Sequence, residues 1–222
     1  MKIGITIQLI KKRSLFVNGI GLNCLMFYDV VNKIDFVDEI YLVNTNKEKL
    51  TEEEIAELDW LKDYNVINWD SQTRDNINFL ITLGSVPHDT DLKWFKEKEG
   101  NKIVGYKGGN SFILHMEELL FNGKIGDDNT TKNGILKTRE FDEIWMVPQQ
   151  EYHNKQYLEI QHKCKVRSVP FVWSPKFIEK DAKVYEGTNK TPWFDEKVFD
   201  KYVVACVEPN TSVLKNMLPI LY

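Results

Sequence analysis

Four loops of this 222-residue chain carry residues that can bind a ligand or move a proton. Each loop follows an apolar run and precedes a predicted helix, where backbone N–H groups and polar side chains can bind anions and hydroxyl groups. The candidate ligand-binding residues are Ser14, Asn18, Gly19, Gly109, Asn110 and Gln149, then Glu208, Asn210 and Lys215, and the candidate proton-transfer residues are His115 and Glu117.

The first loop, residues 14–21, contains Gly19 and Gly21, which reproduce part of a dinucleotide-binding fingerprint. The match is incomplete, because Cys24 occupies the third glycine position and the loop is too long for the tight turn. Two interpretations stay open. The glycines let a ligand approach the start of a helix, or Asn18-Gly19 forms a simple turn.

The second loop, residues 108–111 (Gly-Gly-Asn-Ser), lies between an apolar strand pattern and a helical one. Adjacent glycines allow close backbone approach, so Gly109 and Asn110 are candidates for anion or hydroxyl binding. A plain turn explains the loop equally well. His115 and Glu117 follow on the predicted helix, although a lone helical histidine is more often packed or exposed than catalytic.

The third and fourth loops follow later strands. Gln149 can bind sugar or base hydroxyls, and a solvated helix start is the default alternative. Glu208, Asn210 and Lys215 combine a carboxylate at a strand end, a helix cap and a lysine one turn on, which suits a nucleotide diphosphate and its ribose. An N-capped helix with a surface lysine is the structural alternative.

Two further patterns are not taken as metal sites. Asp89-Thr90-Asp91 resembles the metal-binding Asp-x-Asp of one glycosyltransferase class, and we interpret it instead as the cap and first turn of a helix. His153, His162 and Cys164 lack the spacing of a closed zinc site. No metal or other cofactor is expected.

The composition is that of a globular protein, with 42% hydrophobic and 28% charged residues. A net charge of −4 argues against a function in which the protein binds the phosphates of a nucleic acid. Three cysteines that lie far apart fit a reducing compartment. With no apolar run of spanning length and a strand pattern directly after Met1, the sequence predicts a cytoplasmic protein without a membrane span or signal peptide.

The elements that position these loops alternate between strand and helix. Strands are predicted at 2–10, 38–44, 65–69, 79–84, 102–106, 143–148, 165–173 and 202–209. Helices are predicted at 20–33, 51–63, 91–100, 111–121, near 150–162 and from about 211 onward. This alternation predicts an α/β fold, a Rossmann-like, doubly wound and mostly parallel sheet. In such a sheet, ligands bind at the carboxyl ends of the strands.

Two stretches lack periodicity. Residues 122–142 are predicted as a surface loop, and residues 174–201, which are rich in charge, as an interdomain linker. One strand and one helix follow the linker. A single βα unit cannot bury its own apolar faces, so it either packs on the main sheet or opens a second domain.

The ordered series of motifs resembles a family of uncharacterised bacterial and phage proteins related to GT-B glycosyltransferases. The resemblance covers nearly the whole chain. Its motifs are KIGITI at 2–7, Ser14 to Ile20 with Asn23, Lys102 to Gly109, Glu117 to Phe121, Glu143 to Trp145 with Pro148-Gln149, Val169 to Trp173 with Pro175, and Glu208 to Asn210 with Lys215 and Pro219. The chain departs from the family at Phe112, where a tyrosine is expected, and at His115, where an acidic residue is expected.

The resemblance implies two Rossmann-like domains: residues 1–173 on the acceptor side, a linker at 174–201, and residues 202–222 as the first unit of a truncated donor-side domain. It implies a hexosyltransferase-type enzyme that moves a sugar from a nucleotide-sugar donor to an unknown acceptor without a metal. His115 or Glu117 would be the base, Ser14, Asn18, Gly19, Gly109, Asn110 and Gln149 would contact substrate, and Glu208, Asn210 and Lys215 would contact the donor.

Two other functions remain open. A Rossmann-like half that lacks its second domain or a partner chain can bind a nucleotide or a protein and perform no chemistry. The net negative charge of the chain disfavours modified DNA as the acceptor. The short basic cluster at 11–13 cannot supply the basic surface that DNA binding needs.

Overall fold

The computed structural model describes residues 1–10, 19–70, 73–109, 111–112 and 139–172. The chain divides into two units, Met1–Phe177 and Ile178–Tyr222, and every described residue belongs to the first. The linker at 174–201, the strand and helix after it, and most of the helix predicted at 111–121 lie outside the described residues.

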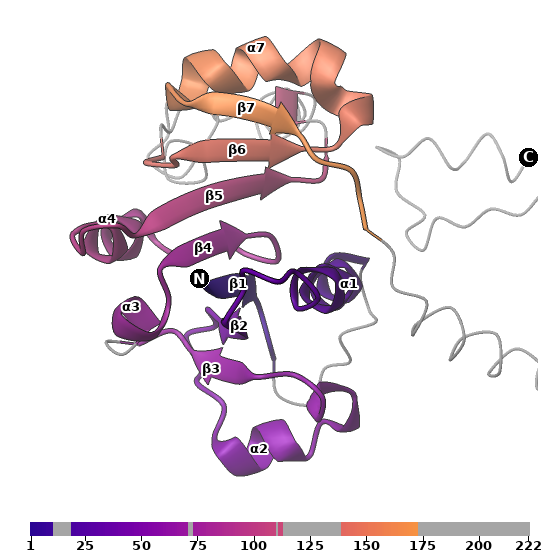
Figure 1. The fold of residues 1–222 in the computed structure, drawn as a ribbon, viewed down its shortest axis with the longest axis vertical. Helices are drawn as coiled ribbons and strands as arrows, with labels where there is room; N and C mark the ends of the chain where they lie inside the picture. Colours follow the sequence, from indigo (N-terminus) through magenta and orange to yellow (C-terminus); the bar gives the residue numbers. More distant parts are fainter. Residues whose placement is uncertain (11–18, 71–72, 110, 113–138, 173–222) are drawn as a thin grey trace, which may run out of the picture. The chain divides into compact units, whose positions relative to one another are not determined.

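The described part of the chain is built on one parallel sheet of seven strands in the order β3-β2-β1-β4-β5-β6-β7 (Figure 1). The strands are β1 (Lys2–Ile7), β2 (Glu39–Asn44), β3 (Val66–Asn68), β4 (Phe79–Thr82), β5 (Lys102–Lys107), β6 (Glu143–Met146) and β7 (Lys165–Ser168). The predicted α/β class is confirmed, and the strand order is that of a Rossmann-like sheet.

The sheet is centred on β1, which pairs with β2 on one side and β4 on the other. Its residues from Ile3 to Ile7 are all buried. Strands buried on both faces are mostly apolar, and in KIGITI only Lys2 at the start and Thr6 are polar. The sequence pattern therefore identified β1 correctly, although the strand ends at Ile7 and not at residue 10.

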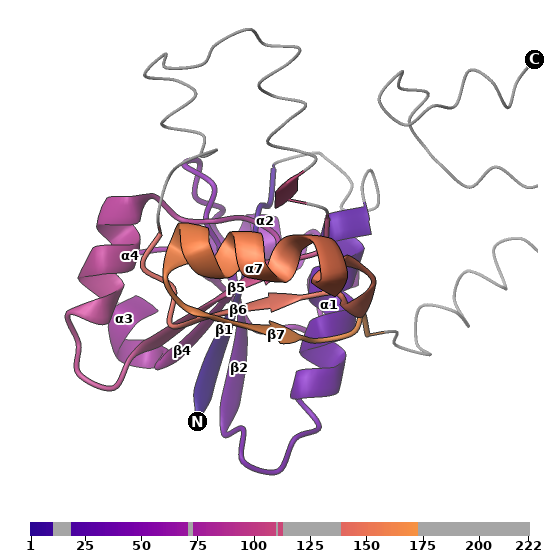
Figure 2. The ribbon, with the colours of Figure 1, turned by 90° about the horizontal axis from the view of Figure 1, so that it is seen from above.

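Helices cover both faces of the sheet. They are α1 (Gly19–Val31), α2 (Glu52–Ala56), α3 (Thr73–Asn76), α4 (Asp89–Lys96) and α7 (Glu151–His162), with short 3-10 turns η2 (Asp59–Leu61) and η3 (Pro148–Gln150). Figure 2 shows α1 on one side of the sheet and α3 and α4 on the other. Among the described helices, none is long and apolar enough to cross a membrane.

Each face has its own apolar core. On one face, Cys24, Leu25 and Phe27 of α1 pack with Ile5 and Leu42 of the sheet. On the other, Leu92 and Phe95 of α4 and Leu158 of α7 pack with Leu80 and Ile103. The apolar spacing in residues 20–33 predicted a helix there, and α1 buries every residue from Cys24 to Tyr28 and not a single narrow stripe.

Two predicted helices differ from the observed ones. The helix predicted at 51–63 is interrupted: Thr51 and Glu54 form a capping box, but α2 ends after one turn and buries no residue that could sustain it. The helix predicted at 91–100 begins at Asp89, because His88 caps it, and ends at Lys96. Gly100 has a φ of 86° and turns the chain toward β5, so it lies beyond the helix and does not stop it.

The end of β4 lies unusually close to the end of β1. A Cβ atom added at Gly84 would lie 2.8 Å from the carbonyl oxygen of Thr6 and 2.7 Å from the sulfur of Cys24. Only a glycine allows the two backbones to approach this closely, and the backbone N–H of Gly84 donates to the Thr6 carbonyl at 2.9 Å.

We therefore expect Gly84→Ala to lower the free energy of unfolding by about 1–3 kcal/mol, because the clash is with backbone and cannot be relieved by a side-chain rotation. The matched control is Gly19→Ala, where an added Cβ meets nothing within 4 Å. Urea denaturation of both variants measures the difference. Equal stabilities would contradict the close packing of β4 on β1.

Candidate functional site

A cavity of about 600 Å³ lies at the carboxyl edge of the sheet, where β1 and β4 are neighbours. In the chain, β1 precedes α1 and β4 precedes α4, and these two helices cover opposite faces of the sheet (Figure 2). Such a point is where open parallel sheets bind ligands. The cavity is lined by Gln8, Thr45, Asn46, Lys47, Trp69, Val86, Pro87, His88, Asp89, Asp91 and Arg139.

The base of the cavity is fixed by hydrogen bonds from the end of β1. Thr6, fully buried, donates its hydroxyl to the Ser85 carbonyl at 2.5 Å. Thr45 donates its backbone N–H to the Ile7 carbonyl at 3.0 Å, and its hydroxyl pairs with that of Ser85. The segments after β2 and β4 are thus both attached to β1, and the cavity lies between them.

One wall depends on two asparagines. Asn44 is buried, and its Oδ1 accepts from the backbone N–H groups of Leu9 and Asn46, each at 3.1 Å. Its Nδ2 donates to Asn68 Oδ1 at 3.1 Å, and Asn68 in turn bonds both backbone groups of Leu50. These bonds hold the segment from Asn46 to Leu50 in place, because loop backbone that lacks a strand partner must find one elsewhere.

The opposite wall is the start of α4. His88 caps the helix, with Nδ1 accepting from the backbone N–H of Thr90 at 3.5 Å, and Asp89 and Asp91 lie in the first turn. The guanidinium of Arg139 lies 3.3 Å from Asp89 and donates to the Pro87 carbonyl at 3.4 Å. Arg139 therefore orients Asp89 and fixes the loop before the helix.

The charges around the cavity nearly balance. Lys47 and Arg139 contribute two positive charges, and Asp89 and Asp91 contribute two negative ones. Amide and hydroxyl groups supply both donors and acceptors, and Trp69 adds an aromatic surface. Such a lining suits a polar ligand with several hydroxyl groups better than a strongly charged or purely apolar one.

Lys107, the last residue of β5, is a cation near Arg139. Burial, and to a smaller extent the positive charge of Arg139, lower the pKa of Lys107 from its ordinary 10.5 to about 8. Its Nζ lies 6.0 Å from the centre of the Phe141 ring. Among the residues that the structure describes, no carboxylate forms an ion pair with it.

Of the site residues predicted from the sequence, the structure describes three. Gly19 begins α1, Gly109 follows β5, and Gln149 lies in η3 after β6; all three are exposed and follow the carboxyl ends of strands. They share the edge of the sheet with the cavity but do not line it. Ser14, Asn18, Asn110, His115, Glu117, Glu208, Asn210 and Lys215 lie outside the described residues.

The loops of Gly109 and Gln149 are connected by a buried side chain of α7. Asn154 accepts from the backbone N–H of Phe112 at 3.0 Å and donates to the Gln150 carbonyl at 3.2 Å. The space beside Gly108 is occupied by the protein itself, because a Cβ added at Gly108 would lie 3.1 Å from the ring of Phe171. The close approach that we expected of a ligand there is made by an aromatic side chain.

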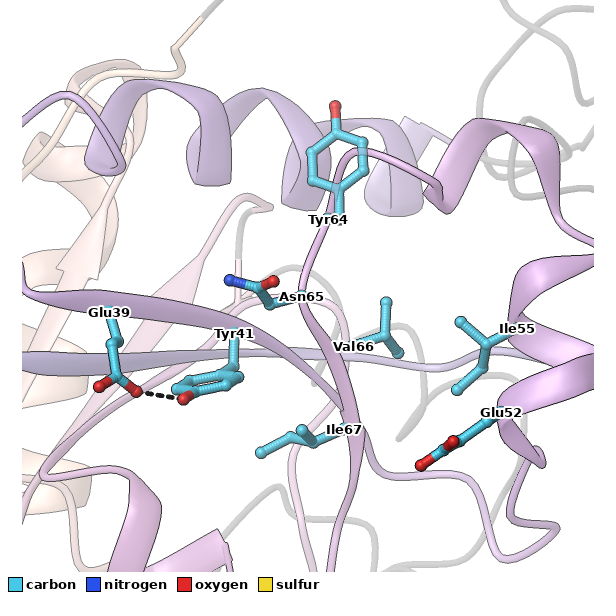
Figure 3. A pocket seen from close by; sticks show the side chains of 8 residues that line it. All are labelled: Glu39, Tyr41, Glu52, Ile55, Tyr64, Asn65, Val66 and Ile67. Atoms are coloured by element: carbon cyan, nitrogen blue, oxygen red, sulfur yellow. Dashed lines mark hydrogen bonds between the residues drawn. The ribbon is translucent and has the colours of Figure 1, made fainter.

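A second pocket, of about 550 Å³, opens between α2 and the edge strand β3. Figure 3 shows Glu52 and Ile55 of α2 across from Val66 and Ile67 of β3. Its polar groups are largely occupied. Tyr41 donates to Glu39 (Figure 3), Glu39 lies 2.7 Å from Lys2, and Asn65 donates to the Ile40 carbonyl. It also lies away from the carboxyl edge, so the first cavity is the candidate functional site.

Sequence patterns did not single out the loops after β2 and β4 as ligand-binding segments, although both line the cavity. The run Asn44-Thr45-Asn46, polar residues directly after a strand, was a usable signal. The prediction that Asp89-Thr90-Asp91 forms the first turn of a helix is confirmed, although His88 is the cap. Within the described ranges, no cluster of three or more histidine, cysteine or acidic side chains could hold a metal ion.

Comparisons with known proteins place the chain by family. A model of a family described as "Protein of unknown function (DUF2827)" matches residues 3–222. The match includes every residue that lines the cavity. No curated protein matches the chain.

Removal of the Asn44 side chain should destabilise the cavity wall. In Asn44→Ala, the N–H groups of Leu9 and Asn46 lose their acceptor, and we expect the free energy of unfolding to fall by about 2–4 kcal/mol. Asn46→Ala removes one bond, from Nδ2 to the Leu9 carbonyl, and should cost less. Urea denaturation and amide hydrogen exchange at Leu9 test this; equal losses in the two variants would refute it.

The lowered pKa of Lys107 makes stability depend on pH. The unfolded chain holds this proton up to about 10.5 and the folded chain up to about 8, so the unfolded state binds more protons between these values. The loss of folding stability caused by burying the charged lysine is therefore complete below pH 8 and disappears as the pH rises toward 10.5. We expect Lys107→Met to have a higher free energy of unfolding than wild type at pH 7. This difference should become smaller as the pH rises.

The matched control for that titration is Lys102→Met, which removes an exposed lysine from the first position of the same strand. It should retain the wild-type pH dependence. Chemical denaturation between pH 7 and 10 measures all three proteins. If the difference in free energy of unfolding between Lys107→Met and wild type stays constant from pH 7 to 10, Lys107 does not titrate in this range.

Proposed function

The chain belongs to the DUF2827 family, and we propose that this member is a GT-B-like glycosyltransferase, which transfers a sugar from a nucleotide-sugar donor to an acceptor. The cavity at the carboxyl edge carries the proposal. It lies at the β1–β4 junction and combines two amides, one hydroxyl, two carboxylates and an indole. Amides and carboxylates hydrogen-bond to sugar hydroxyls, and an aromatic face contacts the C–H groups of a sugar ring.

Transfer requires one bond to break and one to form. The bond between the anomeric carbon and the phosphate oxygen of the donor breaks, and the nucleoside diphosphate leaves with the electron pair. The acceptor oxygen forms the new bond to that carbon, and its proton passes to a base. The protein must therefore hold an acceptor hydroxyl next to a carboxylate or an imidazole.

The described cavity contains such a group. Asp91 lines it from the first turn of α4 and has no ion-pair partner within the described part of the chain, whereas Asp89 is paired with Arg139. We propose Asp91 as the acceptor-side base in this cavity. His115 and Glu117, predicted from the resemblance, remain alternative bases, and Glu208, Asn210 and Lys215 remain the proposed donor contacts.

The balanced charge of the cavity lining also limits which class of acceptor it can bind. Because Lys47 and Arg139 offset Asp89 and Asp91, the cavity does not offer the basic surface that a DNA backbone requires. We therefore propose a glycan or a small hydroxyl compound as acceptor. The competing proposal is a module that binds such a ligand without catalysis, and it predicts ligand binding with no turnover.

The test combines binding and turnover. Calorimetry of the full chain with a panel of nucleotide sugars detects the donor, and NMR follows donor hydrolysis or transfer to added sugars. Asp91→Asn should lower the rate about 10²–10⁴-fold with little change in donor affinity, because it removes the base and keeps the shape. The control is Asp75→Asn, which removes an exposed carboxylate of α3 outside the cavity.

His115→Ala and Glu117→Gln, measured in parallel, decide among the three candidate bases. A rate loss confined to one of those two variants would reject Asp91. Binding of a sugar nucleotide with neither hydrolysis nor transfer would favour the non-catalytic module. Absence of binding across the panel would overturn the glycosyltransferase proposal.

A further inference from the structure

We propose that Trp69 selects the acceptor, and that the acceptor is a pyranose ring whose C–H face lies on the indole. The inference rests on the proposed function in treating the occupant of the cavity as the acceptor. It narrows the acceptor from any glycan or small hydroxyl compound to a ring-shaped sugar, and it assigns that choice to one side chain of the cavity lining.

The position of Trp69 is fixed by the sheet. Trp69 directly follows β3, and its backbone N–H donates to the Asn44 carbonyl at 2.8 Å, which continues the pairing of β3 with β2 by one residue. Asn44 is also the buried residue whose side chain holds the neighbouring cavity wall. Trp69 therefore lies at the carboxyl end of β3, beside the Thr45–Asn46 segment that lines the same cavity.

The indole of Trp69 is also held by aromatic neighbours. The centre of its ring lies 6.1 Å from that of Trp94 at an interplanar angle of 72°, and 6.1 Å from that of the fully buried Phe95 at 37°. The guanidinium of Arg74 lies 4.6 Å from the centre of the Trp94 ring and donates to the Trp94 carbonyl at 3.2 Å. Because these contacts fix the indole, the part of Trp69 that lines the cavity is a rigid aromatic surface.

A carboxylate lies next to this surface. Asp91 and Trp94 are three residues apart on α4, so their side chains lie on the same side of the helix, and the ring of Trp94 packs on that of Trp69. Asp91 and Trp69 also line the same cavity. A sugar ring on the indole can therefore present its edge, which carries the hydroxyl groups, to the carboxylate that we propose as the base.

Other polar groups of the lining are available to the hydroxyls of such a ring. Among the residues that the structure describes, none accepts from the indole N–H of Trp69, and none bonds the side-chain amide of Gln8. Asn46 donates from Nδ2 to the Leu9 carbonyl at 2.8 Å, so its Oδ1 stays an acceptor for a ligand. The cavity thus offers both donors and acceptors around one aromatic surface.

This combination fits a pyranose better than other ligands that carry hydroxyl groups. A pyranose has a face of C–H groups, which matches an aromatic surface, and hydroxyls around its edge. A linear polyol has the same hydroxyls but no fixed face, and it loses more conformational entropy on binding. A nucleobase also stacks, but its edge has fewer donors for the two carboxylates of the lining, whereas every sugar hydroxyl can donate.

The test follows the indole N–H resonance of Trp69 by NMR in the isotope-labelled full chain, where the resonance is assigned by its absence from Trp69→Phe. The probes are the methyl glycosides of glucose, galactose, mannose and N-acetylglucosamine, with sorbitol and uridine for comparison. We expect at least one glycoside to shift this resonance saturably and to receive magnetisation from the protein at its ring C–H protons. Sorbitol and uridine should bind about tenfold more weakly or less.

Three variants test the role of the indole. Trp69→Leu should weaken glycoside binding about tenfold or more, because it removes the aromatic surface, whereas Trp69→Phe should retain most of the affinity. The control is Trp60→Leu, which removes a tryptophan of η2 outside the cavity and should change the affinity less than about twofold. Equal binding by wild type and Trp69→Leu would overturn the proposal.

The wild-type measurements decide the question even if Trp69→Leu fails to fold. A Trp69 resonance that none of the four glycosides moves, or equal binding of sorbitol, would overturn the pyranose assignment, as would tighter binding of uridine. Glycoside binding without sugar transfer would support this site and count against the proposed transferase. Sugar transfer to an acceptor that has no sugar ring would reject this site and leave the transferase proposal intact.

Discussion

The described structure depends on hydrogen bonding at the carboxyl end of β1. The carbonyl of Thr6 accepts from Gly84, its hydroxyl bonds to Ser85, and the carbonyl of Ile7 accepts from Thr45. These bonds attach the segments that follow β2 and β4 to the central strand. The cavity lies between these two segments, next to β1 and β4, and the helices after β1 and β4 lie on opposite faces of the sheet. Fold and site therefore share one set of contacts.

The walls of the cavity show how a polar site is held in a rigid shape. Asn44 satisfies two backbone N–H groups and contacts Asn68, so a buried amide takes the place of a strand ladder. Arg139 does the same on the other side by bonding Pro87 and Asp89. Side chains that are fixed in this way leave others, such as Asp91, available to a ligand.

Lys107 differs from these side chains, because its charge is buried and no described carboxylate pairs with it. An apolar side chain at the end of β5 would pack against Phe141 without the penalty of burying a charge, yet the position carries an ammonium near Arg139. The lowered pKa of Lys107 reflects this burial, and we expect the position to reduce the free energy of unfolding below pH 8.

Local sequence patterns predicted the strands and most of the described helices, because burial on both faces leaves apolar runs such as residues 2–7 and because the buried side chains of α4, Leu92 and Phe95, have helical spacing. The patterns also placed Gly19, Gly109 and Gln149 at strand ends. They could not show that α2 would stop after one turn, since that depended on what the helix found to pack against.

What only the tertiary structure decided is which strand ends are neighbours. The order β3-β2-β1-β4 brings Gln8, Asn46 and Asp89 to one cavity from three separate loops, and it adds Arg139 from a stretch with no periodic signal. The physical reason is that strand order follows from long-range pairing of similar apolar surfaces. A sequence read locally gives the end of each strand, but the energies that select its neighbours act between residues far apart in the chain.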